Sequence, residues 1–226
     1  SSTKQADGSD SEVYIKPVSI YPDPFRRNFD GNKSNSYSYL VLCDLWLPNN
    51  DPHPDNTRAI ANKIFNNGKV KSEVPMFGLE QEFFFVDMNT NKPLGFPNNG
   101  YPDPQGKYYC SVGAGNCYGR NIADNILKNA LYCELNVTGL NFEVAPGQCE
   151  LQLCDKGIKA ADDLLMLRYL MVRTAENYKV KIELHPKPVK GDWNGSGCHT
   201  NFSTCKMRNE GGLEYIYDAI SKLELK

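Results

Sequence analysis

An alternating run of apolar and acidic residues at positions 77–85 constrains the fold of this chain more than any other feature. It reads FGLEQEFFF, and in a β-strand every second side chain lies on the same face. Leu79 and Phe83 then share one face, whereas Glu80 and Glu82 lie on the other, about 7 Å apart. One face is expected to pack on a core while the other presents two carboxylates. An edge strand with a solvated acidic face is the alternative, and this strand alone does not decide between them.

A second pair of glutamates flanks a predicted turn. Pro146 and Gly147 are typical of the central positions of a type II turn. If these two residues form the whole loop, Glu143 lies opposite Glu150, with Cβ atoms about 5 Å apart. Two facing carboxylates repel each other unless a positive charge lies between them. A longer loop would loosen this pairing, and two unrelated surface glutamates are the alternative.

A polar run at residues 192–204, DWNGSGCHTNFST, contains a single histidine, His199. Small residues and side-chain amides bring backbone N–H groups and an imidazole close to a charged ligand. A lone histidine is more often structural, but the carboxylate-bearing strands favour a metal ligand here. Carboxylates suit Mg²⁺ or Mn²⁺, and no tetrahedral set accompanies Cys198 to favour zinc. Two hard cations among carboxylates indicate phosphoryl transfer.

Composition excludes several classes of protein. The 226 residues are 40% hydrophobic and 23% charged with a net charge of −2, so we expect neither nucleic acid nor a membrane as partner. The eight cysteines are scattered without a CxxC pair, which favours reduced thiols and a cytoplasmic location. The glycine-rich run at 113–120 does not fit a dinucleotide motif, and the chain has no P-loop.

The order of elements indicates a mixed fold. Short β-prone runs at 13–15 and 39–43 enclose a loop at 26–38, and helices are expected over 56–67, 120–135, 159–178 and 212–223. Strands alternate with these helices after residue 55. For the helix at 159–178 the expected buried stripe consists of Leu164, Leu165, Tyr169, Met171 and Val172.

Five motifs together resemble glutamine synthetases of the eukaryotic type, in the family's order. They lie at residues 77–82, 96–102, 104–110, 146–148 and 192–204, and the resemblance extends over essentially the whole chain. It implies an α+β fold with a partial N-terminal β-grasp domain at residues 1–52. A C-terminally truncated catalytic α/β domain at 53–226 would follow, with a curved antiparallel sheet that carries the metal-binding carboxylates.

The resemblance also implies an activity, a site and an assembly. The family joins ammonia to L-glutamate with ATP, through γ-glutamyl phosphate, and releases L-glutamine, ADP and phosphate. By their place in the motifs, Glu82, Glu143 and Glu150 resemble the family's ligands of one metal. Glu80 and His199 resemble two ligands of the second metal, and these five residues are the expected catalytic residues. L-Glutamate would bind to Trp193, Asn194 and Gly195. ATP would bind to Glu80, Glu150, Asn201, Phe202 and Ser203. The family forms homo-oligomers of stacked rings, here expected to be a decamer with sites shared between subunits.

Departures from the family keep other hypotheses open. Cys149 and Leu151 stand where aromatic residues are usual, Cys154 and Asp155 replace a usual Gly-Pro, and Ser196 replaces an alanine. The chain also lacks the family's ammonia-site aspartate and its C-terminal arginines. We therefore expect these 226 residues alone to be inactive. The alternatives are a non-catalytic structural relative and a γ-glutamyl ligase that uses another amine.

Overall fold

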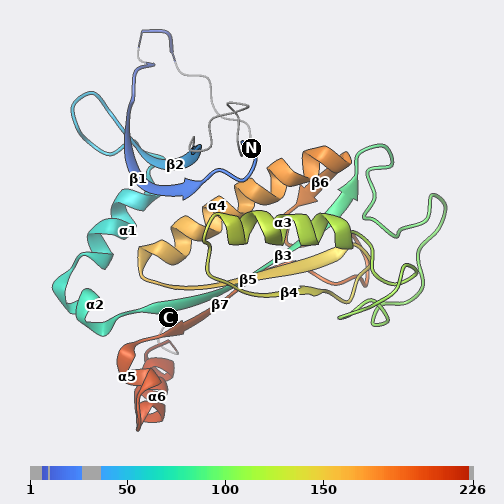
Figure 1. Ribbon diagram of the computed structural model, residues 1–226. Coiled ribbons are helices and arrows are strands. Elements are labelled where there is room, and N and C mark those ends of the chain that lie inside the picture. The colour runs from blue at the N-terminus through green and yellow to red at the C-terminus, as the bar shows by residue number, and fades with distance from the viewer. Residues whose placement is uncertain (1–6, 10, 27–36, 224–226) are drawn as a thin grey trace. The chain divides into compact units, whose positions relative to one another are not determined.

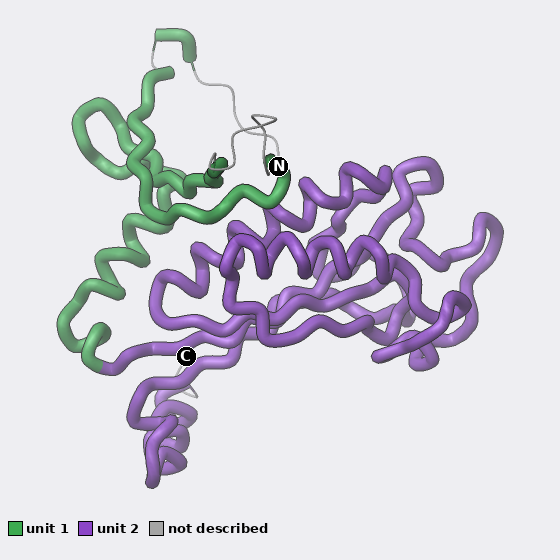
Figure 2. The backbone as a smooth tube through the Cα atoms, viewed as in Figure 1, with its two compact units in different colours: residues 1–72 green, residues 73–226 purple. Residues whose placement is uncertain are grey.

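The computed structural model describes residues 7–9, 11–26 and 37–223, which form two compact units (Figures 1 and 2). Residues 1–72 make up the first unit and residues 73–226 the second. Most of the loop expected at 26–38 lies outside the described residues.

The first unit contains a two-stranded antiparallel sheet, one helix and most of a second. β1 (Tyr14–Pro22) pairs with β2 (Tyr39–Trp46), and a bulge interrupts the ladder between Pro17 and Ser19. Asn56 caps α1 (Thr57–Phe65) by accepting a hydrogen bond from the Ala59 N–H at 3.0 Å, which confirms the helix start predicted from the sequence. The helix expected over 56–67 ends at Phe65, and Gly68 begins the short helix α2 (Gly68–Glu73).

The second unit is built on a five-stranded antiparallel sheet. Its long central strand β3 (Met76–Asp87) pairs with β5 (Gln148–Lys156) on one side, and β5 pairs with β4 (Val137–Phe142). On its other side the first half of β3 pairs with β7 (Cys198–Ser203) and its second half with β6 (Val180–Glu183). The predicted strand at 77–85 therefore forms the middle of the sheet and not an edge.

Two antiparallel helices cover one face of this sheet (Figure 1). They are α3 (Arg120–Tyr132) and α4 (Ile158–Ala175), which a 3₁₀ turn, η1 (Glu176–Tyr178), extends. Leu79, Phe83 and Phe85 of β3 are buried, as the alternation predicted, and the Phe83 and Phe85 rings meet edge to face at 5.1 Å. Beyond β7 lie α5 (Cys205–Arg208) and α6 (Gly212–Leu223); the latter has the bounds expected for the closing helix.

The buried stripe of α4 differs from the prediction. Met171 is buried, but Leu165, Tyr169 and Val172 are 50%, 44% and 50% exposed. The buried side carries Ala160, Asp163, Met166, Leu167, Leu170, Met171 and Thr174. Two polar residues on this side have partners, since Asp163 pairs with Lys159, and the Thr174 hydroxyl accepts a hydrogen bond from Asn129 at 2.9 Å. The predicted stripe therefore shares only Met171 with the buried side of the helix.

A polar contact on the helix-covered face of the sheet joins α4 to β3. Gln81 is only 2% exposed, and its Oε1 accepts hydrogen bonds from Arg168 Nε at 2.8 Å and Nη2 at 2.5 Å. Its Nε2 donates to the Glu82 carbonyl at 2.7 Å. The odd-numbered side chains of β3 thus face the helices, and Glu80 and Glu82 face the opposite side of the sheet.

Candidate active site

Two cross-strand pairs organise the face of the sheet that the helices leave open. Glu82 of β3 is paired with Glu150 of β5, and Glu80 of β3 is paired with His199 of β7. Cα atoms of directly paired residues in an antiparallel ladder lie about 4.5–5.5 Å apart. The sequence placed the two glutamates of β3 on one face, but it could not show which residues on the neighbouring strands would meet them.

The position of Glu143 corrects the predicted hairpin. The turn itself forms as expected, since the Gln148 N–H donates to the Ala145 carbonyl at 3.2 Å, and Gly147 has φ +72°. The ladder, however, pairs Asn141 and not Glu143 with Glu150. The Glu143 N–H donates to the Gln148 carbonyl at 3.0 Å, so the loop is longer than Pro146 and Gly147, and Ala145 within it is buried beside Phe84 and Val86. Glu143 therefore lies just beyond the end of β4.

Mutual repulsion and burial act on these carboxylates. Burial raises the pKa of the Glu82 carboxyl, and the negative charges of Glu150 and Glu80 raise it further, against hydrogen bonds from Gly197 and Gln148. Burial likewise raises the pKa of Glu143, with added repulsion from Glu82 and Glu150. Among the described residues, no lysine or arginine nitrogen lies within 4.0 Å of a carboxylate oxygen of the four glutamates. The face is therefore negatively charged without a compensating cationic side chain.

Each of the four carboxylates accepts a hydrogen bond from one side-chain amide. The donors are Asn201 to Glu80 at 2.6 Å, Gln148 to Glu82 at 2.8 Å, Asn141 to Glu143 at 2.9 Å, and Gln152 to Glu150 at 2.6 Å. These amides orient the carboxylates through neutral partners that leave the negative charge in place. No sequence pattern predicted this amide set, although Gln148 and Asn201 lie inside the motifs at 146–148 and 192–204.

The chemistry of the donor set fits a hard divalent cation. Carboxylate oxygens with a single imidazole are ligands that Mg²⁺ and Mn²⁺ accept. In the described part of the chain, no three His, Cys, Asp or Glu side chains form a ready-made metal cage. The backbone register thus brings Glu80, Glu82, Glu150 and His199 onto one face, and the assignment of all five metal ligands stays a prediction.

The turn at residues 192–197 lies against the carboxylates. Gln148 Nε2 donates to the Gly195 carbonyl at 2.8 Å, and Asn194 Nδ2 donates to Gln148 Oε1 at 3.2 Å. Gln105 accepts from the Asn194 N–H at 2.7 Å. The ring of Trp193 packs against Phe96 and Tyr101, with centroids 5.0 and 6.3 Å away. The three residues predicted to bind substrate are thus held by side chains from three other segments.

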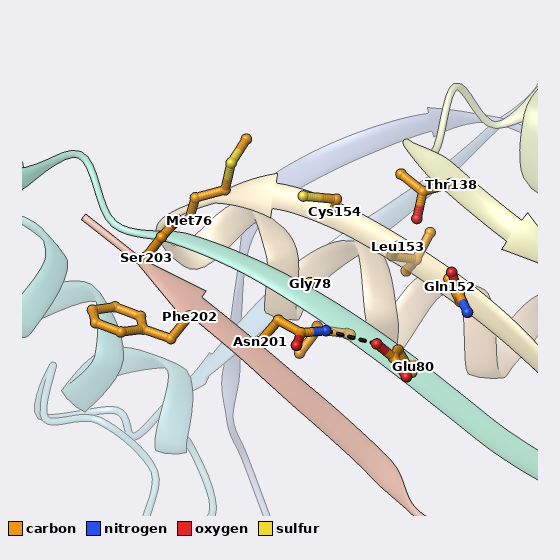
Figure 3. Close-up of a pocket in the computed structure, with 11 residues that line it drawn as sticks. Met76, Gly78, Glu80, Thr138, Gln152, Leu153, Cys154, Asn201, Phe202 and Ser203 are labelled. Atoms are coloured by element: carbon orange, nitrogen blue, oxygen red, sulfur yellow. Dashed lines mark hydrogen bonds between the residues drawn. The ribbon is translucent and has the colours of Figure 1, made fainter. Parts of the chain in front are cut away.

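A pocket of about 410 Å³ adjoins Glu80 on the same face (Figure 3). Asn201, Phe202 and Ser203 of β7 line it with Glu80, whereas Glu150, the remaining residue predicted to contact ATP, does not. Asn201 Nδ2 donates to Glu80 Oε1, the dashed line in Figure 3, and Asn201 Oδ1 lies 3.2 Å from His199 Nε2. Gln152 and Cys154 line the opposite wall, from β5.

Comparison with known families shows to which family the chain belongs. The family model described as "Glutamine synthetase, catalytic domain" matches residues 54–219, which is more than half of the chain. The chain therefore belongs to the glutamine synthetase family.

Relatives by sequence include plant glutamine synthetases, and the eukaryotic type of the family fits. The chain is 49% identical over its whole length to a cytosolic isozyme of glutamine synthetase from Daucus carota, of which it covers 62%. It is also 49% identical to a chloroplastic/mitochondrial glutamine synthetase from Arabidopsis thaliana and 48% identical to a cytosolic isozyme from Pinus sylvestris, covering 51% and 61% of them. The chain thus spans between half and two thirds of these relatives. No helix in the described residues is long and apolar enough to cross a membrane.

Proposed function

We propose that this chain is the greater part of a subunit that ligates ammonia to L-glutamate at the expense of ATP. The products would be L-glutamine, ADP and phosphate. The observation that carries the proposal is the pairing of Glu82 with Glu150 beside the pairing of Glu80 with His199, on the sheet face that also holds the pocket. Membership of the glutamine synthetase family supports the same activity.

In this proposal, Glu82, Glu143 and Glu150 would hold one divalent cation and Glu80 and His199 would hold a second. The cations, Mg²⁺ or Mn²⁺, would neutralise phosphate oxygens and lower the electrostatic cost of phosphoryl transfer. The chain's own part is to orient these ligands through the amides of Asn141, Gln148, Gln152 and Asn201.

The two substrates would bind on either side of the carboxylates. Asn194 and Gly195, with Trp193 beside them, would position L-glutamate, and the pocket at Asn201, Phe202 and Ser203 would take ATP. A γ-carboxylate oxygen of glutamate attacks the γ-phosphorus of ATP, and the bond to the β-phosphate oxygen breaks to give ADP. Ammonia then attacks the acyl carbon, phosphate leaves, and one proton is lost to give the amide of glutamine.

Four further proposals follow from the family. Residues 1–52 would form part of a β-grasp domain and 53–226 a catalytic domain; the match from residue 54 supports this division, although the compact units divide after residue 72. The whole protein would assemble into stacked rings, a decamer, with shared sites, and these 226 residues alone would be inactive. A cytoplasmic location is supported by the cytosolic relatives, whereas other relatives carry chloroplastic names.

The test is phosphate release from ATP by the longer protein that contains this chain, measured with Mg²⁺ or Mn²⁺. We expect release to require both L-glutamate and ammonium and to vanish in Glu82→Ala. If phosphate release requires a different amine and not ammonium, that amine is the second substrate and ammonia is not. A folded protein that binds the cations but releases no phosphate with any amine would instead be a non-catalytic relative.

A further inference from the structure

We propose that Gln148 is a positioning residue that couples the cation site at Glu82 to the turn that holds glutamate. The inference rests on the proposed function and deepens it. Gln148 is the first residue of β5 and is paired with Phe84 of β3, on the carboxylate face of the sheet.

The side-chain amide of Gln148 joins two parts of the site directly. It is 0% exposed. Its Nε2 donates to Glu82 Oε2 and to the Gly195 carbonyl, both at 2.8 Å, and its Oε1 accepts from Asn194 Nδ2 at 3.2 Å. One fully buried group therefore contacts a predicted metal ligand and two predicted glutamate-binding residues. Both N–H donors of the amide are used, so a shift of either partner costs a buried hydrogen bond.

The turn before Gln148 fixes where its side chain begins. Gly147 has φ +72°, and a Cβ at this position would lie 2.6 Å from the Leu94 carbonyl oxygen, so only glycine fits without a backbone shift. The Gln148 N–H closes the turn on the Ala145 carbonyl. The backbone is thus held on both sides, and the amide has little freedom to follow a moving partner.

A second glutamine provides an internal comparison. Gln105 accepts from the Asn194 N–H at 2.7 Å and donates from Nε2 to the Asp192 carbonyl at 3.0 Å. It therefore supports the same turn, but no hydrogen bond joins it to Glu82 in the described structure. Losing Gln105 should loosen the turn alone, whereas losing Gln148 should affect the turn and Glu82 together.

Linkage makes the consequence measurable. If Gln148 holds Glu82 and the turn in one arrangement, binding of a cation at Glu82 favours binding of glutamate at the turn, and the reverse holds by the same factor. Removing a hydrogen-bond partner of a metal ligand typically lowers metal affinity or activity by about 10–100-fold. Gln148 touches no reacting atom, so kcat should fall less than the affinities.

The experiment compares Gln148→Met with Gln105→Met in the longer protein that contains this chain. Methionine keeps the length of the glutamine side chain and removes its donors. Mn²⁺ affinity is measured by titration calorimetry with and without L-glutamate, and KM for glutamate and kcat are measured at saturating ATP and ammonium. For Gln148→Met we expect Mn²⁺ affinity without glutamate to fall and KM for glutamate to rise, each by about tenfold or more. For Gln105→Met we expect only KM to rise.

A folded Gln148→Met protein with wild-type Mn²⁺ affinity and wild-type KM would overturn the proposal, and so would equal effects of both substitutions on Mn²⁺ affinity. If Gln148→Met does not fold, Gln148→Glu keeps the size and removes both donors, and an unchanged KM would then contradict the inference. If the wild-type protein makes no glutamine, the proposed function fails. The Mn²⁺ titrations then still decide whether Gln148 supports Glu82.

Discussion

Glu82 of β3 and Glu150 of β5 lie directly opposite each other in an antiparallel ladder, although both side chains are acidic. Glu150 is only 5% exposed, and their negative charges repel across the strands. Like charges in this position destabilise a sheet. The fold therefore keeps a pair that costs stability in the absence of a cation.

Removing one charge of this pair should have opposite effects with and without metal. In EDTA, Glu150→Gln should raise the free energy of unfolding by up to about 1 kcal/mol, because cross-strand repulsion is lost. With Mn²⁺ at one hundred times its Kd, the wild-type protein should gain about 2.7 kcal/mol, and the variant should gain much less. Thermal unfolding under both conditions measures this, with the exposed Glu210→Gln as control. The same Mn²⁺ response in both proteins would contradict the prediction.

Ser196→Ala should stabilise the protein. Ser196 is 5% exposed, and its hydroxyl oxygen is buried with no hydrogen-bond partner in the described structure. Burying an unpaired polar group costs stability, so alanine should raise the free energy of unfolding by about 1 kcal/mol. Urea denaturation of the metal-free protein measures the change. Ser203→Ala is the matched control, because the Ser203 hydroxyl accepts a hydrogen bond from Arg208 at 2.8 Å. A loss of stability in Ser196→Ala would show that its hydroxyl is paired.

Asp155 should make the second unit sensitive to acid. Burial raises the pKa of Asp155, but hydrogen bonds from the Lys156 N–H and the Lys159 ammonium outweigh it and hold the pKa below its ordinary value. A folded-state pKa below the unfolded one stabilises the protein above the unfolded value, and this contribution is lost as pH falls through the folded pKa. Asp155→Asn should therefore flatten the fall in unfolding free energy between about pH 5 and pH 2.

The control for this pH dependence is again Glu210→Gln, which removes one exposed carboxylate. Unfolding free energies from urea denaturation at each pH give the two curves. An Asp155→Asn curve as steep as that of the wild-type protein would remove Asp155 as a source of acid sensitivity.

Gly78→Val should obstruct the pocket beside Glu80. A Cβ at Gly78 would lie 3.3 Å from Asn201 Cβ and 3.4 Å from Asn201 Nδ2, and further methyl groups would enter the pocket (Figure 3). Overpacking of this kind costs about 1–3 kcal/mol, so we expect ADP to bind about 5- to 150-fold more weakly. Titration calorimetry with ADP and Mg²⁺ measures this in the longer protein. Gly115→Val, with open space around its Cβ, is the control, and unchanged ADP affinity in Gly78→Val would place the nucleotide elsewhere.

Local patterns predicted the elements better than their partners. The alternation at 77–85 gave the correct faces of β3, and the spacing at 212–223 gave the bounds of α6. The pairing of Glu82 with Glu150 depends on which strand lies beside β3, which no local pattern encodes. The predicted pairing of Glu143 with Glu150 failed because the loop is longer than Pro146 and Gly147, which was the alternative that the turn signal left open.

The part of the candidate site that the sequence did not predict is its set of hydrogen-bonding amides. The acidic residues and His199 stood out in the sequence because their chemistry is conspicuous. The amide of Gln148 did not, since its role depends on contacts with Glu82 and Gly195, which are 66 and 47 residues away along the chain. Such long-range contacts are set by the whole sheet and not by the motif around the residue.

The most direct test of the account is to locate Mn²⁺ by anomalous diffraction at the manganese edge, in crystals of the longer protein grown with Mn²⁺ and ADP. We predict one peak bordered by the carboxylates of Glu82, Glu143 and Glu150, and a second beside Glu80 and His199. Anomalous peaks only at other positions, or none in crystals of protein that makes glutamine, would contradict the assignment of this sheet face as the metal site.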